Sequence, residues 1–145
     1  WSRSPKQLAG VKSFTGPDQL PAFLNATRVL VNLLPLTPDT ENILNRANLS
    51  QLQAGSFLIN VARGSVVDEA ALITALQNNV IAGAALDVFE NEPAVNPGLL
   101  ELDNAVLIPH LGSATVETRA AMADIAATNA LAILAGKQAP NLVTS

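Results

Sequence analysis

The fold of this chain follows from one stretch of sequence, FLINVARG at residues 57–64. It begins as a largely apolar run that is too short for a helix, and it ends with Arg63 and Gly64. Three further runs have the same character, at residues 29–34, 82–89 and 105–108. We therefore predict four short strands at these positions.

Helical segments separate the predicted strands. They cover residues 19–26, 49–54, 69–78 and 116–135. Asp18, Asn48 and Asp68 are the expected N-caps of the first three helices. Strand and helix alternate, which is typical of βαβ units and a mostly parallel sheet. Residues 90–104 contain turn-forming Pro, Gly and Asn, and we expect them to form a long loop at the functional edge.

The composition limits the class of protein. Hydrophobic residues make up 49% of the chain and aromatic residues 3%, so we expect a core of Leu, Val, Ile and Ala. Such a core suits parallel strands covered by helices on both faces. The net charge of −4 argues against a nucleic-acid partner.

The cysteine count and the apolar stretches add further limits. The sequence has no cysteine, which excludes a disulfide, a thiolate nucleophile and a Cys-based metal site. This is compatible with a reducing compartment, and we expect a cytoplasmic protein. No apolar stretch is long enough to span a bilayer. We expect neither a metal nor a membrane partner.

Three polar residues follow the predicted strands, namely Arg63, Glu92 and His110. If the strands are parallel neighbours, these side chains reach the carboxyl edge of one sheet, where open α/β sheets bind ligands. A cation, an acid and an imidazole at one edge suggest carbonyl chemistry. Taken singly, each residue also has a structural interpretation, as a surface ion pair, a loop acid or a hydrogen-bonded histidine.

Each of these residue types suits a separate chemical role. Arg63 can bind a carboxylate through two hydrogen bonds, and Gly64 allows a ligand to approach the backbone. His110 is the only histidine, and imidazole can donate a proton to a ketone oxygen when hydride reaches its carbon. Glu92 can stabilise and orient the charged imidazole, although Glu90 is an equal candidate on spacing alone.

Two other positions suggest a nucleotide cofactor. Asp87 ends an apolar strand, and a buried acid there needs partners, either an amide of a ligand or backbone groups. Ser2, Arg3 and Ser4 would meet the adenosine ribose if they end the second strand of a dinucleotide fold. An arginine between two hydroxyls suits a 2′-phosphate, which favours NADP over NAD. The alternative is a frayed, basic N-terminus.

Four segments carry a family resemblance. They are LLPLTPDT at 33–40, LINVARGSVVDEAAL at 58–72, GAALDVFENEP at 83–93 and PHLGSAT at 109–115. Together they resemble the D-isomer-specific 2-hydroxyacid dehydrogenases, and residues 1–4 and 22–35 are similar to the glyoxylate/hydroxypyruvate reductase A branch. The resemblance implies an α/β fold with a Rossmann-like, doubly wound parallel sheet.

The resemblance also implies a role for each candidate residue. The catalytic acid of the family directly precedes a proline, which selects Glu92 over Glu90. Arg63 then corresponds to the group that binds the substrate carboxylate, and His110 to the general acid. The implied cofactor-binding residues are Ser2, Arg3, Ser4, Leu34, Pro35, Val61, Ala62, Asp87 and Gly112.

One departure from the family is large. The Gly-x-Gly-x-x-Gly turn that precedes the second strand of the family does not occur in this sequence. We therefore expect a truncated Rossmann-like domain that lacks its first strand and belongs to the C-terminal part of a longer enzyme. Residues 1–115 would be a partial dinucleotide-binding domain, and residues 116–145 a helix and tail that return toward a substrate domain.

The expected function is NADPH-dependent reduction of small 2-oxo acids, such as glyoxylate or hydroxypyruvate, by the full-length enzyme. We expect NADPH to be preferred over NADH, and a homodimer with the last helix as an interface element. The alternative is a non-catalytic, nucleotide-sensing protein on the same scaffold, similar to transcriptional co-repressors that resemble this family.

Overall fold

The computed structural model describes residues 1–143, and the chain divides into two units, Trp1–Pro109 and His110–Ser145. The elements of the first unit, in chain order, are η1 (Pro17–Gln19), α1 (Leu20–Asn25), β1 (Val29–Asn32), α2 (Arg46–Leu49), β2 (Phe57–Asn60), η2 (Gly64–Val66), α3 (Glu69–Gln77), β3 (Gly83–Leu86), α4 (Pro97–Leu100) and β4 (Ala105–Leu107). The second unit contains α5 (Val116–Leu134).

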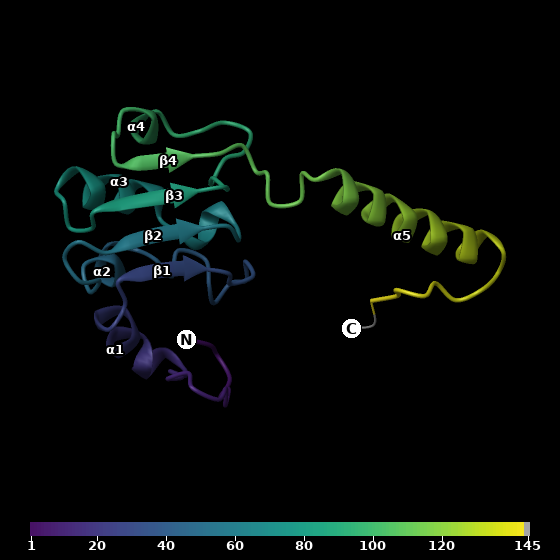
Figure 1. The fold of residues 1–145 in the computed structure, drawn as a ribbon, viewed down its shortest axis with the longest axis horizontal. Helices are drawn as coiled ribbons and strands as arrows, with labels where there is room; N and C mark the ends of the chain where they lie inside the picture. The colour runs from purple at the N-terminus through teal and green to yellow at the C-terminus, as the bar shows by residue number, and fades with distance from the viewer. Residues whose placement is uncertain (144–145) are drawn as a thin grey trace. The chain divides into compact units, whose positions relative to one another are not determined.

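The four strands form one parallel sheet in the order β1-β2-β3-β4 (Figure 1). Asn32 pairs with Asn60, and Leu86 pairs with both Asn60 and Leu107, so the strands end in register. All four predicted strands are confirmed, and each ends before its apolar run does. The segments that follow the strands therefore begin at one edge of the sheet.

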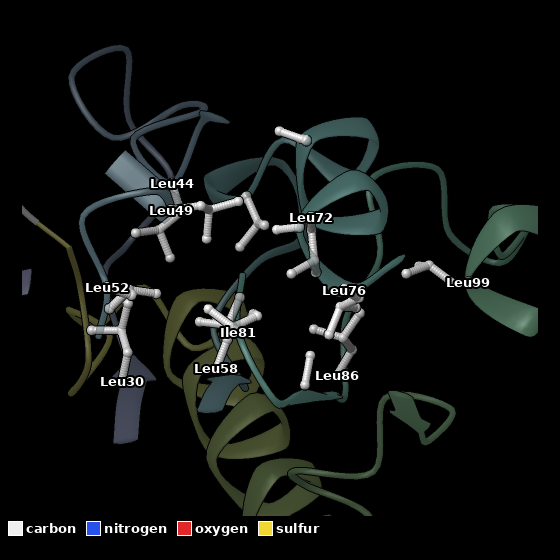
Figure 2. Close-up of a cluster of buried hydrophobic side chains, with 14 of the residues drawn as sticks. Leu30, Leu44, Leu49, Leu52, Leu58, Leu72, Leu76, Ile81, Leu86 and Leu99 are labelled. Atoms are coloured by element: carbon white, nitrogen blue, oxygen red, sulfur yellow. The ribbon is translucent and has the colours of Figure 1, made fainter. Parts of the chain in front are cut away.

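One face of the sheet carries the hydrophobic core. Leu30, Leu58 and Leu86 lie on three neighbouring strands and are at most 5% exposed. They belong to one cluster with Leu72 and Leu76 of α3 (Figure 2). Full burial of a leucine contributes about 1.5–3 kcal/mol, so this layer of leucines holds the sheet and the helix together.

The alternate positions of the strands are exposed in the first unit. Val29, Val31, Phe57 and Val106 are between 47% and 63% exposed. Within this unit, helices therefore cover one face of the sheet, and the apolar side chains of the other face are exposed. Apolar composition shows which side chains can be buried, but it does not show which face of a sheet is covered.

Helix starts were predicted correctly at one position and wrongly at two. The Asp68 side chain accepts a hydrogen bond from Ala71 N at 2.9 Å and caps α3 as predicted. Asn48 lies inside α2, because Asn45 is the cap and accepts from Asn48 N at 3.1 Å. Asp18 lies inside η1 and is not its cap. Both misplaced caps lie in a first helical turn, where short polar residues cluster.

The predicted loop at residues 90–104 contains a short helix, α4. The Asn96 side chain caps it by accepting from Gly98 N at 3.0 Å. Pro97 occupies the first helical position, where its fixed φ favours the helix. The turn-forming residues of this segment therefore start a helix as well as loops.

The second unit is dominated by α5. Thr115 caps this helix by accepting from Thr118 N at 3.2 Å, and Gly136 follows its end with a φ of 70°. The predicted helix at 116–135 is thus confirmed to within one residue. None of the helices described within residues 1–143 is long and apolar enough to cross a membrane.

Candidate functional site

Two buried asparagines shape the carboxyl edge of the sheet. Asn32 ends β1 and Asn60 ends β2, and Asn32 Nδ2 donates to Asn60 Oδ1 at 2.9 Å. Each Oδ1 also accepts from a backbone N–H two residues further on, Leu34 N and Ala62 N, at 3.2 Å in both cases. Asn60 Nδ2 donates to Arg63 O at 3.0 Å. The pair therefore fixes the turns after both strands.

Arg63 lies in the turn after β2, and its residue is exposed. Its Nη1 donates to Ala62 O at 2.6 Å. A guanidinium carries five N–H donors, so a two-bond contact with a carboxylate remains possible. The adjacent Gly64 is buried, and a Cβ there would collide with backbone atoms of Phe89 and Glu90. The Arg63 turn therefore packs closely against the turn after β3.

Asp87 is the residue that directly follows β3. It is 3% exposed, and its backbone N–H donates to Asn60 O at 2.9 Å. Its backbone is thus held against the end of β2, and its burial agrees with the sequence prediction of a buried acid. Its proposed contact with a cofactor amide stays a prediction.

Glu92 lies in the turn that begins at Phe89. Its Oε1 accepts a hydrogen bond from Phe89 N at 3.0 Å. The carboxylate therefore folds back toward the start of its own turn, close to the backbone against which Gly64 packs. This turn is exposed at Glu92 and at Pro93, so a ligand at the sheet edge can reach it.

Glu90 has a different environment. Its Oε1 accepts from Glu69 N at 2.9 Å, and its own N–H donates to Glu69 Oε1 at 2.7 Å. Glu69 is 4% exposed. Burial raises the pKa of the Glu69 carboxyl, and the charge of Glu90 adds to this, while hydrogen bonds with Glu90 N–H and the Asn96 side chain oppose it. Glu90 thus ties the turn to the start of α3.

His110 and Gly112 belong to the second unit. His110 follows β4 after Ile108 and Pro109. Its φ of 51° is left-handed, a conformation that histidine adopts more readily than most residues. The grouping of His110 with Arg63 and Glu92 stays a prediction, as does the position of Gly112 beside a nicotinamide ring.

A pocket of about 660 Å³ lies between the first residues of the chain and the turn after β1. Ser2, Arg3 and Ser4 line it, together with Leu34 and Pro35. The structure therefore brings together five predicted cofactor residues from two distant parts of the sequence. Val61 and Ala62 lie in the next turn, after β2, and do not line this pocket.

The same pocket contains an acid that the sequence analysis missed. Asp39 lines it, and its Oδ2 lies 4.0 Å from Arg3 Nη1, with both side chains about four-fifths exposed, at 78% and 82%. Exposed ion pairs contribute at most about 1 kcal/mol, so the guanidinium can turn to another anion. The first residues lie outside the sheet, and Ser2 forms an isolated bridge with Thr15.

The buried asparagines were also missed, although the sequence carries a signal for them. Asn32 and Asn60 are each the one polar residue at the end of an otherwise apolar strand. A buried amide in such a place needs partners, and two of them on neighbouring strands can satisfy each other. Within residues 1–143, no group of three or more His, Cys, Asp or Glu side chains could hold a metal ion.

A parallel α/β sheet with polar turns at its carboxyl edge is the frame on which dinucleotides bind in Rossmann-like domains. Residues 1–112 match the model of the family described as D-isomer specific 2-hydroxyacid dehydrogenase, NAD binding domain. The chain belongs to this family, and both the family resemblance and the Rossmann-like fold expected from the sequence are confirmed.

Curated relatives agree with this assignment. The chain is 43% identical to a glyoxylate reductase of Pyrococcus furiosus, over 99% of its own length and 43% of that protein. It is 41% identical to glyoxylate/hydroxypyruvate reductase A of Yersinia enterocolitica, over 99% of its length and 45% of that protein. The chain therefore spans less than half the length of these relatives.

Solved structures show the same fold. A D-isomer specific 2-hydroxyacid dehydrogenase from Xanthobacter autotrophicus is 47% identical with a TM-score of 0.89, over 99% of this chain and 47% of that one. An NADPH-dependent glyoxylate/hydroxypyruvate reductase from Sinorhizobium meliloti, in complex with NADP and malonate, is 45% identical with a TM-score of 0.87, over 98% of this chain and 44% of that one.

Proposed function

We propose that the full-length protein reduces small 2-oxo acids, such as glyoxylate and hydroxypyruvate, with NADPH. One observation carries this proposal above the others. Gly64 packs against the backbone of Phe89 and Glu90, which puts the turn of Arg63 next to the turn of Glu92. The turns that carry a cation and an acid therefore lie next to each other at the edge where open α/β sheets bind ligands, which supports roles for both residues. The names of the relatives support the same chemistry.

Each catalytic residue then has one role. Arg63 binds the substrate carboxylate and polarises the neighbouring carbonyl group. NADPH supplies a hydride to the keto carbon. His110 donates a proton to the carbonyl oxygen, so the 2-oxo acid gains one hydride and one proton and becomes a 2-hydroxy acid. Glu92 stabilises the charged imidazole before the proton leaves.

The proposed cofactor is NADP(H) in preference to NAD(H). A guanidinium between two hydroxyls lines the 660 Å³ pocket, and these groups suit a 2′-phosphate. The relative bound to NADP supports this choice, while the family description names NAD. The other proposed cofactor contacts are Leu34, Pro35, Val61 and Ala62, which would line the cofactor site, and Asp87 and Gly112, which would lie near the nicotinamide.

The wider setting is also part of the proposal. We propose a cytoplasmic homodimer, since the sequence has no cysteine and α5 exposes the apolar side chains of Met122, Ile125 and Leu131. Residues 1–115 would serve the dinucleotide, and residues 116–145 would lead toward a substrate domain. The last two of these residues, 144 and 145, lie outside the described part of the chain.

The experiment that tests this function measures NADPH oxidation by the full-length protein with glyoxylate and hydroxypyruvate. Arg63→Lys keeps the charge but loses the two-bond geometry. We expect kcat/KM for both acids to fall about 10- to 100-fold, the effect of one charge-assisted hydrogen bond of about 1.5–3 kcal/mol. Arg28→Lys is the matched control, because Arg28 directly precedes β1 at the opposite edge.

Equal kinetics for Arg63→Lys and the wild-type protein would remove Arg63 from the substrate site. NADPH binding with no turnover of any 2-oxo acid would instead favour the alternative of a nucleotide-sensing protein. A partner-peptide binding assay would then be the next measurement.

A further inference from the structure

The peptide group between Phe89 and Glu90 is held by contacts from outside its own turn. Gly64 packs so closely that a Cβ would collide with Phe89 C, Phe89 O and Glu90 N. Glu90 N donates to Glu69 Oε1 at 2.7 Å. The preceding amide, Phe89 N, donates to the carboxylate of Glu92 at 3.0 Å. Two successive amides are therefore bound by two different carboxylates.

Glu69, which accepts the hydrogen bond from Glu90 N, is an acid that is only 4% exposed. Burying a carboxyl group costs free energy unless hydrogen bonds compensate, and burial accordingly raises its pKa. An apolar side chain of similar size would fill the same space without that cost. It would not supply an acceptor for Glu90 N–H or a hydrogen-bond partner for the Asn96 side chain, and these are the contacts that the acid makes.

The acceptor is itself firmly held. Glu69 is the first residue of α3, and its backbone N–H donates to Glu90 Oε1 at 2.9 Å, so the two residues bind each other reciprocally. The helix is held in the core by Leu72, one turn further on, which is fully buried. The turn after β3 is thus anchored to the start of α3 through the carboxyl groups of both Glu69 and Glu90.

We propose that Glu69 is a positioning residue of the candidate site: by holding the Phe89–Glu90 peptide, it fixes the carboxylate of Glu92 relative to Arg63. The inference rests on the proposed function, since it gives Arg63 and Glu92 their roles. Glu69 itself touches neither substrate nor cofactor in this account. Glu69 would act through the Phe89–Glu90 peptide, which belongs to the turn of Glu92 and packs against Gly64 in the turn of Arg63.

Three variants of the full-length protein separate positioning from folding. Glu69→Leu fills the space and removes the acceptor. Glu69→Gln keeps an oxygen acceptor in the same place. Asp68→Ala is the matched control, because it weakens the start of the same helix, while the Asp68 carboxylate accepts from Ala71 N and not from Glu90.

We expect Glu69→Leu to lower kcat for glyoxylate on the order of 10²-fold, the effect of misplacing reactive groups by about 1 Å. The dissociation constant of NADPH should stay at the wild-type value. Glu69→Gln should restore kcat to within a few-fold, and Asp68→Ala should retain it. Wild-type kcat in Glu69→Leu would overturn the proposal, as would an equal loss of kcat in Asp68→Ala.

Amide hydrogen exchange tests Glu69 without any turnover. The Glu90 amide should exchange about 10-fold faster in Glu69→Leu than in the wild-type protein, because a hydrogen bond to a carboxyl is lost, and at the wild-type rate in Glu69→Gln. If the wild-type protein reduces no 2-oxo acid, the proposed function fails. The exchange rate of the Glu90 amide then tests whether Glu69 holds this turn. An unchanged Glu90 exchange rate in Glu69→Leu would then refute the positioning role.

Discussion

At the scale of single residues, hydrogen bonds separate two acids that the sequence leaves equivalent. Glu90 and Glu92 both follow β3, and only the family resemblance favours Glu92. The Glu90 carboxylate accepts from Glu69 N at the start of α3, whereas the Glu92 carboxylate accepts from Phe89 N in its own turn. The Glu90 carboxylate therefore has a structural contact, which leaves Glu92 as the candidate for catalysis. The catalytic role of Glu92 stays a proposal.

The choice of cofactor can be tested at Arg3. Only NADPH carries a 2′-phosphate, so Arg3→Ala should weaken NADPH binding on the order of 10-fold, by the loss of a charge-assisted hydrogen bond, and should affect NADH much less. Fluorescence titration with both cofactors would measure this. Asp39→Asn removes the acid that pairs with Arg3 and should strengthen NADPH binding. Equal weakening of both cofactors in Arg3→Ala would count against a 2′-phosphate site.

The buried carboxyl of Glu69 predicts a pH-dependent stability. Its pKa is raised in the folded protein, chiefly by burial, so the fold favours the protonated form. Its contribution to stability is complete below the unfolded-state pKa of about 4.3 and is lost as the pH rises through the folded-state value. Glutamine cannot titrate. The free energy of unfolding of Glu69→Gln, relative to that of the wild-type protein, should therefore rise between about pH 4 and about pH 7.

Urea unfolding at both pH values would measure this difference. Glu101→Gln is the control, because Glu101 is exposed and its variant should follow the wild-type protein. The Glu90 carboxylate faces Glu69 and contributes to its pKa, so Glu90→Gln should reduce the same pH dependence. If the free energies of unfolding of Glu69→Gln and the wild-type protein change in parallel with pH, Glu69 has the same pKa in the folded and the unfolded protein, which would contradict the prediction.

At the scale of secondary structure, local patterns predict the strands and the long helices well. The β-strands follow from apolar runs and α3 from an N-cap at Asp68, since both signals lie within a few neighbouring residues. The reciprocal bonds between Glu69 and Glu90 join residues far apart in the sequence, so no local pattern reveals them. The exposed face of β1 is likewise a property of the assembled sheet and not of its residues.

The asparagine pair should matter for the stability of the sheet edge. Asn60→Ala would leave Asn32 Nδ2 and Ala62 N without their acceptor. Unsatisfied buried polar groups cost about 1–3 kcal/mol each, so the free energy of unfolding should fall by at least about 1 kcal/mol. Urea unfolding would measure this. Asn78→Ala, at an exposed site with a bond to Thr74 O, should change stability by about 0.5 kcal/mol or less.

At the scale of the whole molecule, β1 is an edge strand with exposed apolar side chains. Val29 and Val31 are 54% and 48% exposed, and unpaired strand edges promote pairing with another chain. A polypeptide limited to these 145 residues should therefore self-associate, and light scattering would show it. Val31→Lys should reduce the association, whereas Val11→Lys, at an exposed site outside the sheet, should not. A monomer at every concentration would contradict this.

The same polypeptide should bind NADPH weakly and reduce no 2-oxo acid. Its sequence has no Gly-x-Gly-x-x-Gly turn, and such a turn presents backbone donors and a helix N-terminus to the pyrophosphate. Activity is therefore expected of the full-length protein, in which a closed cleft can exclude water.

The most direct test of 2-oxo acid reduction follows the hydride itself. The full-length protein would be incubated with glyoxylate and NADPH that is deuterated at both C4 positions, and the product would be analysed by mass spectrometry and NMR. We expect glycolate with one deuterium on the carbon next to the carboxylate, and in His110→Ala a rate lower by about 10²–10⁴-fold with NADPH still bound. Bound NADPH with no labelled glycolate, or an undiminished rate in His110→Ala, would contradict the proposed reaction.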